Sequence, residues 1–186
     1  ADLKWKRPAP EFSFPFSENF PHLLGANSSF RRSALMEVGG FDEEYEYYLD
    51  ETDVTLRILD AGWKIAQVPG GHVHHKFMPS HIRNDLKVLK NWYPIFKNKI
   101  YFCLMHAAPR RSMQQIIARC TDFIEQQRQG MEWTVSEGLL GPEYRQIFND
   151  HTDRAWRDGL SAGHRGALRT QPANYWSAVE TEFLPY

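Results

Sequence analysis

Apolar residues recur at helical spacing just after residue 50. They are Val54, Leu56, Ile58, Leu59 and Ala61. This spacing places them on one broad face, as in an amphipathic helix. Gly62 follows directly, and glycine commonly ends a helix because it tolerates a left-handed backbone. The pattern predicts a helix that starts near Asp50 and stops at Gly62.

The segments on either side of this helix predict a mixture of strands and helices. Upstream, RRSALMEVGGF predicts a short helix capped by Ser33 and ended by the pair Gly39-Gly40. Phe30, just before it, is expected in a short strand. Downstream, WKIAQVP (residues 63–69) alternates apolar and polar positions and closes on a proline, which predicts a strand.

From residue 78 onward the pattern is mainly helical. Residues 78–108 predict an amphipathic helix capped by Ser80 and kinked or broken at Pro94. Residues 110–130 repeat the helical spacing, and Gly130 is expected to end that helix. Shorter helices are expected after it, and the basic, glycine-rich stretch AWRDGLSAGHRGALRT has no readable role.

Composition narrows the class of protein. The 186 residues fit one globular domain, or a small core with an added subdomain. A formal net charge of −1 gives no electrostatic signature of nucleic-acid binding. Cys103 and Cys120 make no metal motif or disulfide framework, which favours a reducing, intracellular setting. We find neither a signal peptide nor an apolar run long enough to span a membrane.

The first 25 residues are rich in proline, with Pro8, Pro10, Pro15 and Pro21. Proline disrupts helices and strand ladders, so this stretch predicts an extended, loop-like entry. Domains seldom begin in this way, and we therefore expect the chain to start in the middle of a longer protein.

Three carboxylates, Asp50, Glu51 and Asp53, crowd the start of the helix predicted after residue 50. One interpretation is structural, because acids at a helix start accept backbone hydrogen bonds and favour the helix dipole. The other is chemical, because neighbouring carboxylates raise one another's pKa and prepare one of them to act as a general base. The residues alone leave both interpretations open.

Three histidines, His72, His74 and His75, follow the predicted strand within four residues. Histidine is a common ligand of divalent metals and carries protons near neutral pH. The segment has no regular zinc-ligand spacing. A structural or surface role is therefore the alternative to metal binding.

The order of the motifs in residues 24–77 resembles the acceptor-side half of family 2 glycosyltransferases. The motifs are GAN followed by FRR, GGFDE, an acidic pair before DVxLR, GWKI, and VP with a histidine shortly after it. The resemblance implies an α/β fold, namely part of the GT-A (nucleotide-diphospho-sugar transferase) fold. It also implies transfer of a sugar from a nucleotide-diphospho-sugar donor to an acceptor hydroxyl.

The resemblance implies roles for the acidic residues. Aligned on Leu56-Arg57, the family's acidic pair is Asp50-Glu51, whose second member usually serves as the general base. Glu51 is therefore the expected base, and Asp50 is the alternative, or the residue that orients it. Asp53 and Arg57 are expected to support the local structure.

Two further groups of residues match the family's pattern. His75, six residues beyond Pro69, matches a histidine that helps to hold a divalent metal, Mn²⁺ or Mg²⁺, and the diphosphate; His74 is the near alternative. Gly25, Ala26 and Asn27 match a loop that lines the acceptor site. For Asn27 a turn-forming role is an equal alternative, and Phe41 and Trp63 are expected in the core.

The resemblance also implies a division of the chain. Residues 1–80 would be the C-terminal half of a GT-A domain whose nucleotide-binding half is absent, and residues 81–186 a helical C-terminal extension. The fragment alone would then be inactive. The resemblance further implies an inverting hexosyltransferase (EC 2.4) of bacterial cell wall or polysaccharide biosynthesis. Since no Gln-x-x-Arg-Trp motif follows the acidic pair and no membrane span is found, we expect this enzyme to be non-processive.

Expected partners are the donor and a sugar or lipid-linked acceptor, at a cytoplasmic location that includes the inner face of the membrane. The basic, aromatic stretch at residues 86–102 predicts either peripheral membrane contact or a helix packed on the core. The helical tail is a candidate for homo-oligomer contacts. The alternative function is a non-catalytic interaction or membrane-docking module, and a metal-dependent hydrolase is a third interpretation.

Overall fold

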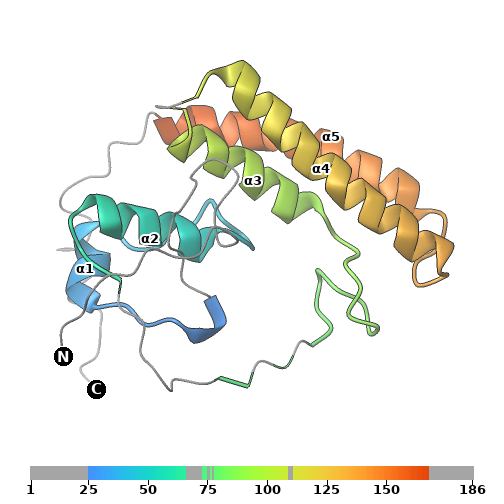
Figure 1. Ribbon diagram of the computed structural model, residues 1–186, viewed down its shortest axis with the longest axis horizontal. Helices are drawn as coiled ribbons and strands as arrows, with labels where there is room; N and C mark the ends of the chain where they lie inside the picture. Colours follow the sequence, from blue (N-terminus) through green and yellow to red (C-terminus); the bar gives the residue numbers. More distant parts are fainter. Residues whose placement is uncertain (1–24, 66–72, 75, 77, 109–110, 168–186) are drawn as a thin grey trace.

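The structure is a computed structural model that describes residues 25–65, 73–74, 76, 78–108 and 111–167. A short 3₁₀ turn, Gly25–Asn27, precedes five helices. They are α1 (Arg32–Glu37), α2 (Asp50–Asp60), α3 (Tyr93–His106), α4 (Met113–Ser136) and α5 (Tyr144–Ala167). The three longest, α3 to α5, lie side by side, and the two short helices lie together to one side of them (Figure 1).

The expected α/β fold, a partial GT-A fold, is wrong for the part of the chain that the structure describes. That part contains helices and no sheet, and its one β-type pairing is an isolated antiparallel bridge between Arg83 and Leu89. Phe30 lies in irregular structure, as do residues 63–65 of the predicted strand, whose residues 66–69 lie outside the described range. A strand needs a partner for its backbone groups, and no described segment offers one.

The helix predicted after residue 50 is confirmed, with the bounds Asp50–Asp60. Gly62 adopts a left-handed backbone (φ 90°) and ends it, as predicted. The next backbone N–H, that of Trp63, donates to the Ile58 carbonyl at 3.1 Å. The short upstream helix is also present as α1, but Ser33 lies inside it and does not cap it.

Proline begins α3 instead of breaking a longer helix. The predicted helix over residues 78–108 is therefore wrong in its first half, since α3 starts only at Tyr93 and carries Pro94 in its first turn. A first-turn proline loses no hydrogen bond, because that N–H has no partner within the helix. Ser80 instead caps a turn: its Oγ accepts from the N–H groups of Ile82 (3.1 Å) and Arg83 (3.3 Å).

Helix α4 runs through the glycine that was expected to end it. Gly130 lies well inside α4, which continues to Ser136 and is followed by Gly138 in a left-handed conformation (φ 70°). At its start, Ser112 and Gln115 form a reciprocal capping box. Two long helices therefore stand where the sequence predicted one helix and several short ones.

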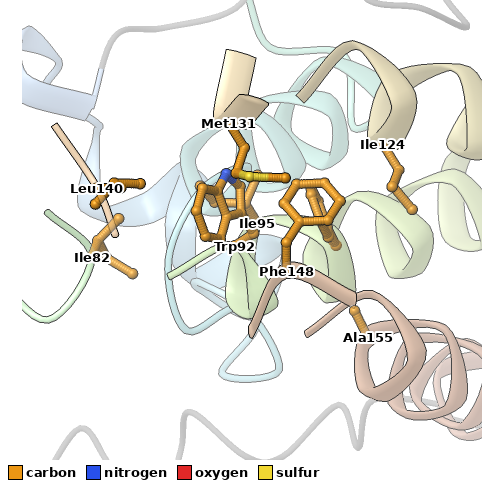
Figure 2. Close-up of a cluster of buried hydrophobic side chains, with 9 residues drawn as sticks. Ile82, Trp92, Ile95, Ile124, Met131, Leu140, Phe148 and Ala155 are labelled. Carbon is orange, nitrogen blue, oxygen red and sulfur yellow. The ribbon is translucent and has the colours of Figure 1, made fainter. Parts of the chain in front are cut away.

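The largest hydrophobic core lies where α3, α4 and α5 meet (Figure 2). Trp92, just before α3, packs its ring edge-to-face on Phe148 of α5, with centroids 5.1 Å apart. Phe96 packs on Phe148 in the same way at 5.3 Å. The cluster's other buried members are Ile82, Ile95, Ile124, Met131, Leu140 and Ala155. Large aromatic rings thus fix the lateral packing of the three-helix body.

A row of glycines lets α5 lie directly on α3. The glycines are Gly159, Gly163 and Gly166, spaced four and three residues apart on one face. A Cβ on Gly159 would lie 2.9 Å from the Ile100 Cβ, and one on Gly163 would overlap Leu104. The absent side chains allow the two backbones to approach closely, which gives the glycine-rich stretch a structural role.

Helix α3 is a packed, buried helix, which is one of the two alternatives for the basic stretch. Lys99 is 1% exposed and lies over the Phe123 ring, 5.3 Å from its centroid. Burial lowers the pKa of Lys99, which the neighbouring thiols of Cys103 and Cys120 partly offset. The α3 lysines therefore do not form an exposed basic face. No described helix is both long and apolar enough to cross a membrane.

Candidate functional site

The acidic helix α2 starts from a strained turn. Tyr48 (φ 76°) and Leu49 (φ 72°) both adopt the left-handed conformation, which costs a residue other than glycine about 1–3 kcal/mol. Leu49 occupies the N-cap position, and its carbonyl accepts the first helical bond from the Asp53 N–H at 2.8 Å. Asp50 and Glu51 consequently stand inside the first turn and do not cap it.

The Glu51 side chain is half-buried, and its pKa is raised from an ordinary 4.5 to about 7. Burial is the largest cause, because it penalises the charged form, and a hydrogen bond with the Asp50 side chain adds to it. Backbone hydrogen bonds at Glu51 and Gly25 act in the opposite direction. A carboxyl group that titrates near neutral pH is suited to general base catalysis.

The turn at Gly25–Asn27 meets this carboxyl group. A Cβ built on Gly25 would lie 3.5 Å from the Glu51 Cδ, in ordinary van der Waals contact. Gly25, Ala26 and Asn27 are all exposed. The structure therefore brings the predicted acceptor loop and the predicted base together, although 26 positions separate Gly25 from Glu51 in the sequence.

Asp53 points the other way, into a buried ionic network. It is 3% exposed, and its Oδ2 accepts from the Arg57 Nη2 (2.6 Å) and Nε (2.9 Å). Its Oδ1 lies 2.7 Å from the His106 Nε2 of α3. Arg57 also donates from Nη1 to the Val38 carbonyl at 2.6 Å. The network ties α2 to the end of α1 and to the end of α3.

The metal ligands expected from the sequence are not assembled in the described part of the chain. His74 is exposed and lies in irregular structure, while His72 and His75 lie outside the described residues. No group of three or more His, Cys, Asp or Glu side chains there has the geometry to hold a metal ion. The described residues by themselves therefore do not make up a metal centre, and we derive no chemical step through one.

Two aromatic residues of the matched segment lie at the edge of the small cluster around α1 and α2. Phe41 is 45% exposed and packs edge-to-face on Phe30, with centroids 5.7 Å apart. Trp63 is partly buried, and its Nε1–H donates to the Glu37 Oε2 at 2.8 Å. Phe41 is therefore a surface residue and not the core residue expected.

Two α3 residues that contact this region had no local signal in the sequence. His106 lies 53 positions after Asp53. Asn98 lies 51 positions after Tyr47, whose carbonyl accepts from its amide. Such pairs have no fixed spacing, so only an alignment of related sequences or a structure could have revealed them.

Comparison with known proteins finds similarity over a short stretch of the chain. A stretch of 55 residues is 46% identical to N-acetylglucosaminyl-diphospho-decaprenol L-rhamnosyltransferase of Mycobacterium tuberculosis, in strains CDC 1551 / Oshkosh and ATCC 25618 / H37Rv. It covers 29% of this chain and 18% of the relative, so the chain spans less than a fifth of the curated relatives it matches. No family model and no solved structure matches. The match supports a glycosyltransferase-type function in coarse terms.

Proposed function

We propose that this chain belongs to a glycosyltransferase in which Glu51 is the general base for an acceptor hydroxyl. One observation carries the proposal: Glu51, with a pKa of about 7, lies against the exposed turn at Gly25. An acceptor held by that turn would present its hydroxyl to the carboxylate. The short similarity to a rhamnosyltransferase agrees with this chemistry.

The proposed reaction is a direct displacement at the sugar's anomeric carbon. The acceptor oxygen forms a bond to that carbon while its proton passes to the Glu51 carboxylate. The bond from the carbon to the nucleotide diphosphate breaks, and the diphosphate leaves with the electron pair. Attack from the opposite face inverts the configuration, and one sugar is added per encounter.

The neighbouring residues have supporting roles in this proposal. Asp50, hydrogen-bonded to Glu51, helps to keep the base's pKa near neutral and orients it. Asp53 and Arg57 hold α2 in place through their ion pair at 2.6 Å. A divalent ion, Mn²⁺ or Mg²⁺, would stabilise the negative charge of the departing diphosphate. His75, or alternatively His74, would be one of its ligands.

The finer assignments rest on the motif order and on the relative's name. We propose membership of family 2, a nucleotide-activated hexose such as L-rhamnose as donor, and a lipid-linked diphosphate sugar as acceptor. Such an acceptor would place the protein at the inner face of the membrane, in bacterial cell wall or polysaccharide biosynthesis. These assignments give the assay its first substrates.

The test compares Glu51→Gln with Glu46→Gln, a matched change at an exposed glutamate upstream of α2. The longest native form of the polypeptide is incubated with Mn²⁺ or Mg²⁺, a panel of nucleotide-activated sugars and lipid-diphosphate N-acetylglucosamine. Nucleotide diphosphate release and glycolipid product are measured. We expect Glu51→Gln to lower kcat by about 10²–10⁴-fold while nucleotide-sugar binding is retained. Near-normal turnover in that variant, or no transfer by the wild type, would overturn the proposal.

A further inference from the structure

Helix α3 holds the loop that leads into α2 by hydrogen bonds from one of its faces. The bonds run from the Tyr101 hydroxyl to the Asp42 Oδ2 (2.5 Å), from the Lys97 Nζ to the Glu44 carbonyl (2.7 Å), and from the Asn98 amide to the Tyr47 carbonyl (2.6 Å). The donors stand at positions 97, 98 and 101, which share a helix face. The loop before the acidic helix is thus fixed by a different part of the chain.

Asn98 is the donor that reaches the strained turn itself. It is fully buried (0% exposed), and its Nδ2 donates to the Tyr47 carbonyl and, at 3.3 Å, to the Tyr48 carbonyl. Those carbonyls belong to the peptide groups on either side of Tyr48, the first residue with a positive φ. Asn98 therefore holds the peptide groups on both sides of that residue.

The oxygen atom of the Asn98 amide shows that the side chain can bind the turn in only one orientation. Its Oδ1 is buried and has no hydrogen-bond partner among the residues that the structure describes. Leaving a buried acceptor unpaired costs about 1–3 kcal/mol. Turning the amide over would not help, because Oδ1 would then face two carbonyl oxygens. The Asn98 side chain therefore keeps its amide nitrogen toward the turn, where it donates hydrogen bonds to the two carbonyls.

The turn sets the direction in which α2 begins. Leu49, the second left-handed residue, is 1% exposed and directly precedes Asp50 and Glu51. Without a partner for its carbonyls, the turn would relax toward the ordinary right-handed or extended regions. Such a change would rotate the first turn of α2 and would move the Glu51 carboxyl group away from Gly25.

We propose that Asn98 is a positioning residue for Glu51: by holding the Tyr47 and Tyr48 carbonyls it keeps the left-handed turn, and through it the carboxyl group against Gly25. This inference rests on the proposed role of Glu51 as the base. It assigns to α3, which lies outside the segment that resembles a glycosyltransferase, a direct part in shaping the site. Asn98 itself does not touch the substrate.

The first test follows the ionisation of Glu51 directly in the whole chain. Carboxyl ¹³C NMR titration of glutamate-labelled protein, with the signal assigned by Glu51→Gln, is compared between the wild type and Asn98→Leu. Leucine has a similar size and no donor. We expect the pKa of Glu51 to fall from about 7 toward its ordinary value as the carboxyl group gains water. Ile124→Ala, a core change in α4, controls for lost stability and should leave this titration unchanged.

The second test is a rescue that a merely structural role would not give. Glycine adopts a positive φ without strain, so Tyr48→Gly should restore the turn in an Asn98→Leu background. The same change removes a ring that stacks on Phe123, with centroids 6.4 Å apart. We expect the double variant to regain the Glu51 titration while its melting temperature falls further. A parallel loss in both readouts would overturn the proposal.

Activity provides the third readout, in the longest native form of the polypeptide. A misplaced base should lower kcat by about 10–100-fold with little change in KM, and the acidic limb of the pH–rate profile should shift to lower pH. Should Asn98→Leu fail to fold, Asn98→Ser is measured in the same way. An unchanged Glu51 titration in a folded Asn98 variant refutes the positioning role. A shifted titration without any transfer by the wild type refutes only the proposed function.

Discussion

Helices α2 and α5 both lie against α3 and both make apolar contacts with it, but the further contacts that hold them there differ in kind. The α2 region is joined to α3 through polar contacts: Asp53 with His106, and Asn98 with the turn before Asp50. Helix α5 is joined by close backbone approach, with Gly163 seated against Leu104. Polar contacts fix a direction and depend on charge, whereas glycine packing depends on shape alone.

The difference corresponds to what each region has to do. The start of α2 carries a base whose pKa depends on its surroundings, so a small shift of the helix changes its chemistry. Helix α5 carries no residue of the candidate site and packs along α3 through its row of glycines. Substitutions that disturb charge should therefore act mainly on α2, and substitutions that add volume should act mainly on α5.

The largest effect is expected from Asp53→Asn. The change leaves the partly buried Arg57 and His106 without the buried carboxylate that they share, which should cost about 3 kcal/mol of unfolding free energy. Urea unfolding at pH 7 measures the loss. Asp60→Asn, at the exposed end of α2, is the control and should change stability little. A loss below about 1 kcal/mol for Asp53→Asn would mean that the network contributes little net stability.

A smaller effect of opposite origin is expected from Gly163→Ala. Alanine favours helices, but here its Cβ would overlap Leu104, and overpacking should cost about 1–3 kcal/mol. Gly130→Ala in α4 is the matched control, since nothing lies within 4 Å of its added Cβ. It should stabilise the protein by up to about 1 kcal/mol. Thermal unfolding of both variants checks the pair, and stabilisation by both would contradict the close approach of α3 and α5.

The stability of the protein should depend on pH through Glu51 of α2, whereas the glycines that pack α5 on α3 carry no titrating group. The pKa of Glu51 is raised by folding from 4.5 to about 7, so in this window the folded state binds more protons than the unfolded state. Stability is therefore lost as pH rises from 4.5 through 7. Glu51→Gln should lack this loss and gain about 1 kcal/mol over the wild type at pH 8, discounted because the half-exposed carboxyl group is screened. Parallel stability curves from pH 4.5 to 8 would refute the raised pKa.

The smallest effect is expected from an exposed ion pair in the helical body. Arg145 of α5 and Glu132 of α4 lie 2.8 Å apart, nearly as close as Arg57 and Asp53, but their side chains are 48% and 44% exposed to water. Arg145→Ala should therefore cost less than about 0.5 kcal/mol. Chemical denaturation at low and at 0.5 M salt tests this. A loss equal to that of Asp53→Asn would show that burial is not what distinguishes the two pairs.

Local signals in the sequence were sufficient for α2. The apolar spacing and Gly62 predicted its two ends, because these signals lie within the helix or directly after it. The same signals failed at Pro94 and Gly130. A proline can begin a helix as well as break one, and packing along a long helix outweighs the cost of one internal glycine. Both outcomes depend on contacts distant in the sequence.

The candidate site divides in the same way. The three neighbouring carboxylates at the start of α2 and the GAN loop could be found from residue types and motif order. The fold then places Gly25 of that loop against Glu51. The expected sheet was an inference from family resemblance, and no described segment forms one. His106 and Asn98 could not be predicted, since their partners lie 50 or more positions away.

The sequence by itself determined which reactive groups are present. They are three carboxylates at the start of an amphipathic helix, and a turn upstream that begins with a glycine. Only the tertiary structure decided how these carboxylates differ. Glu51 meets a backbone turn and becomes easier to protonate, while Asp53 meets Arg57 and His106 within a buried ion network. The reason is that a carboxylate's ionisation depends on its solvation and neighbouring charges, and in this protein those neighbours come from distant parts of the chain.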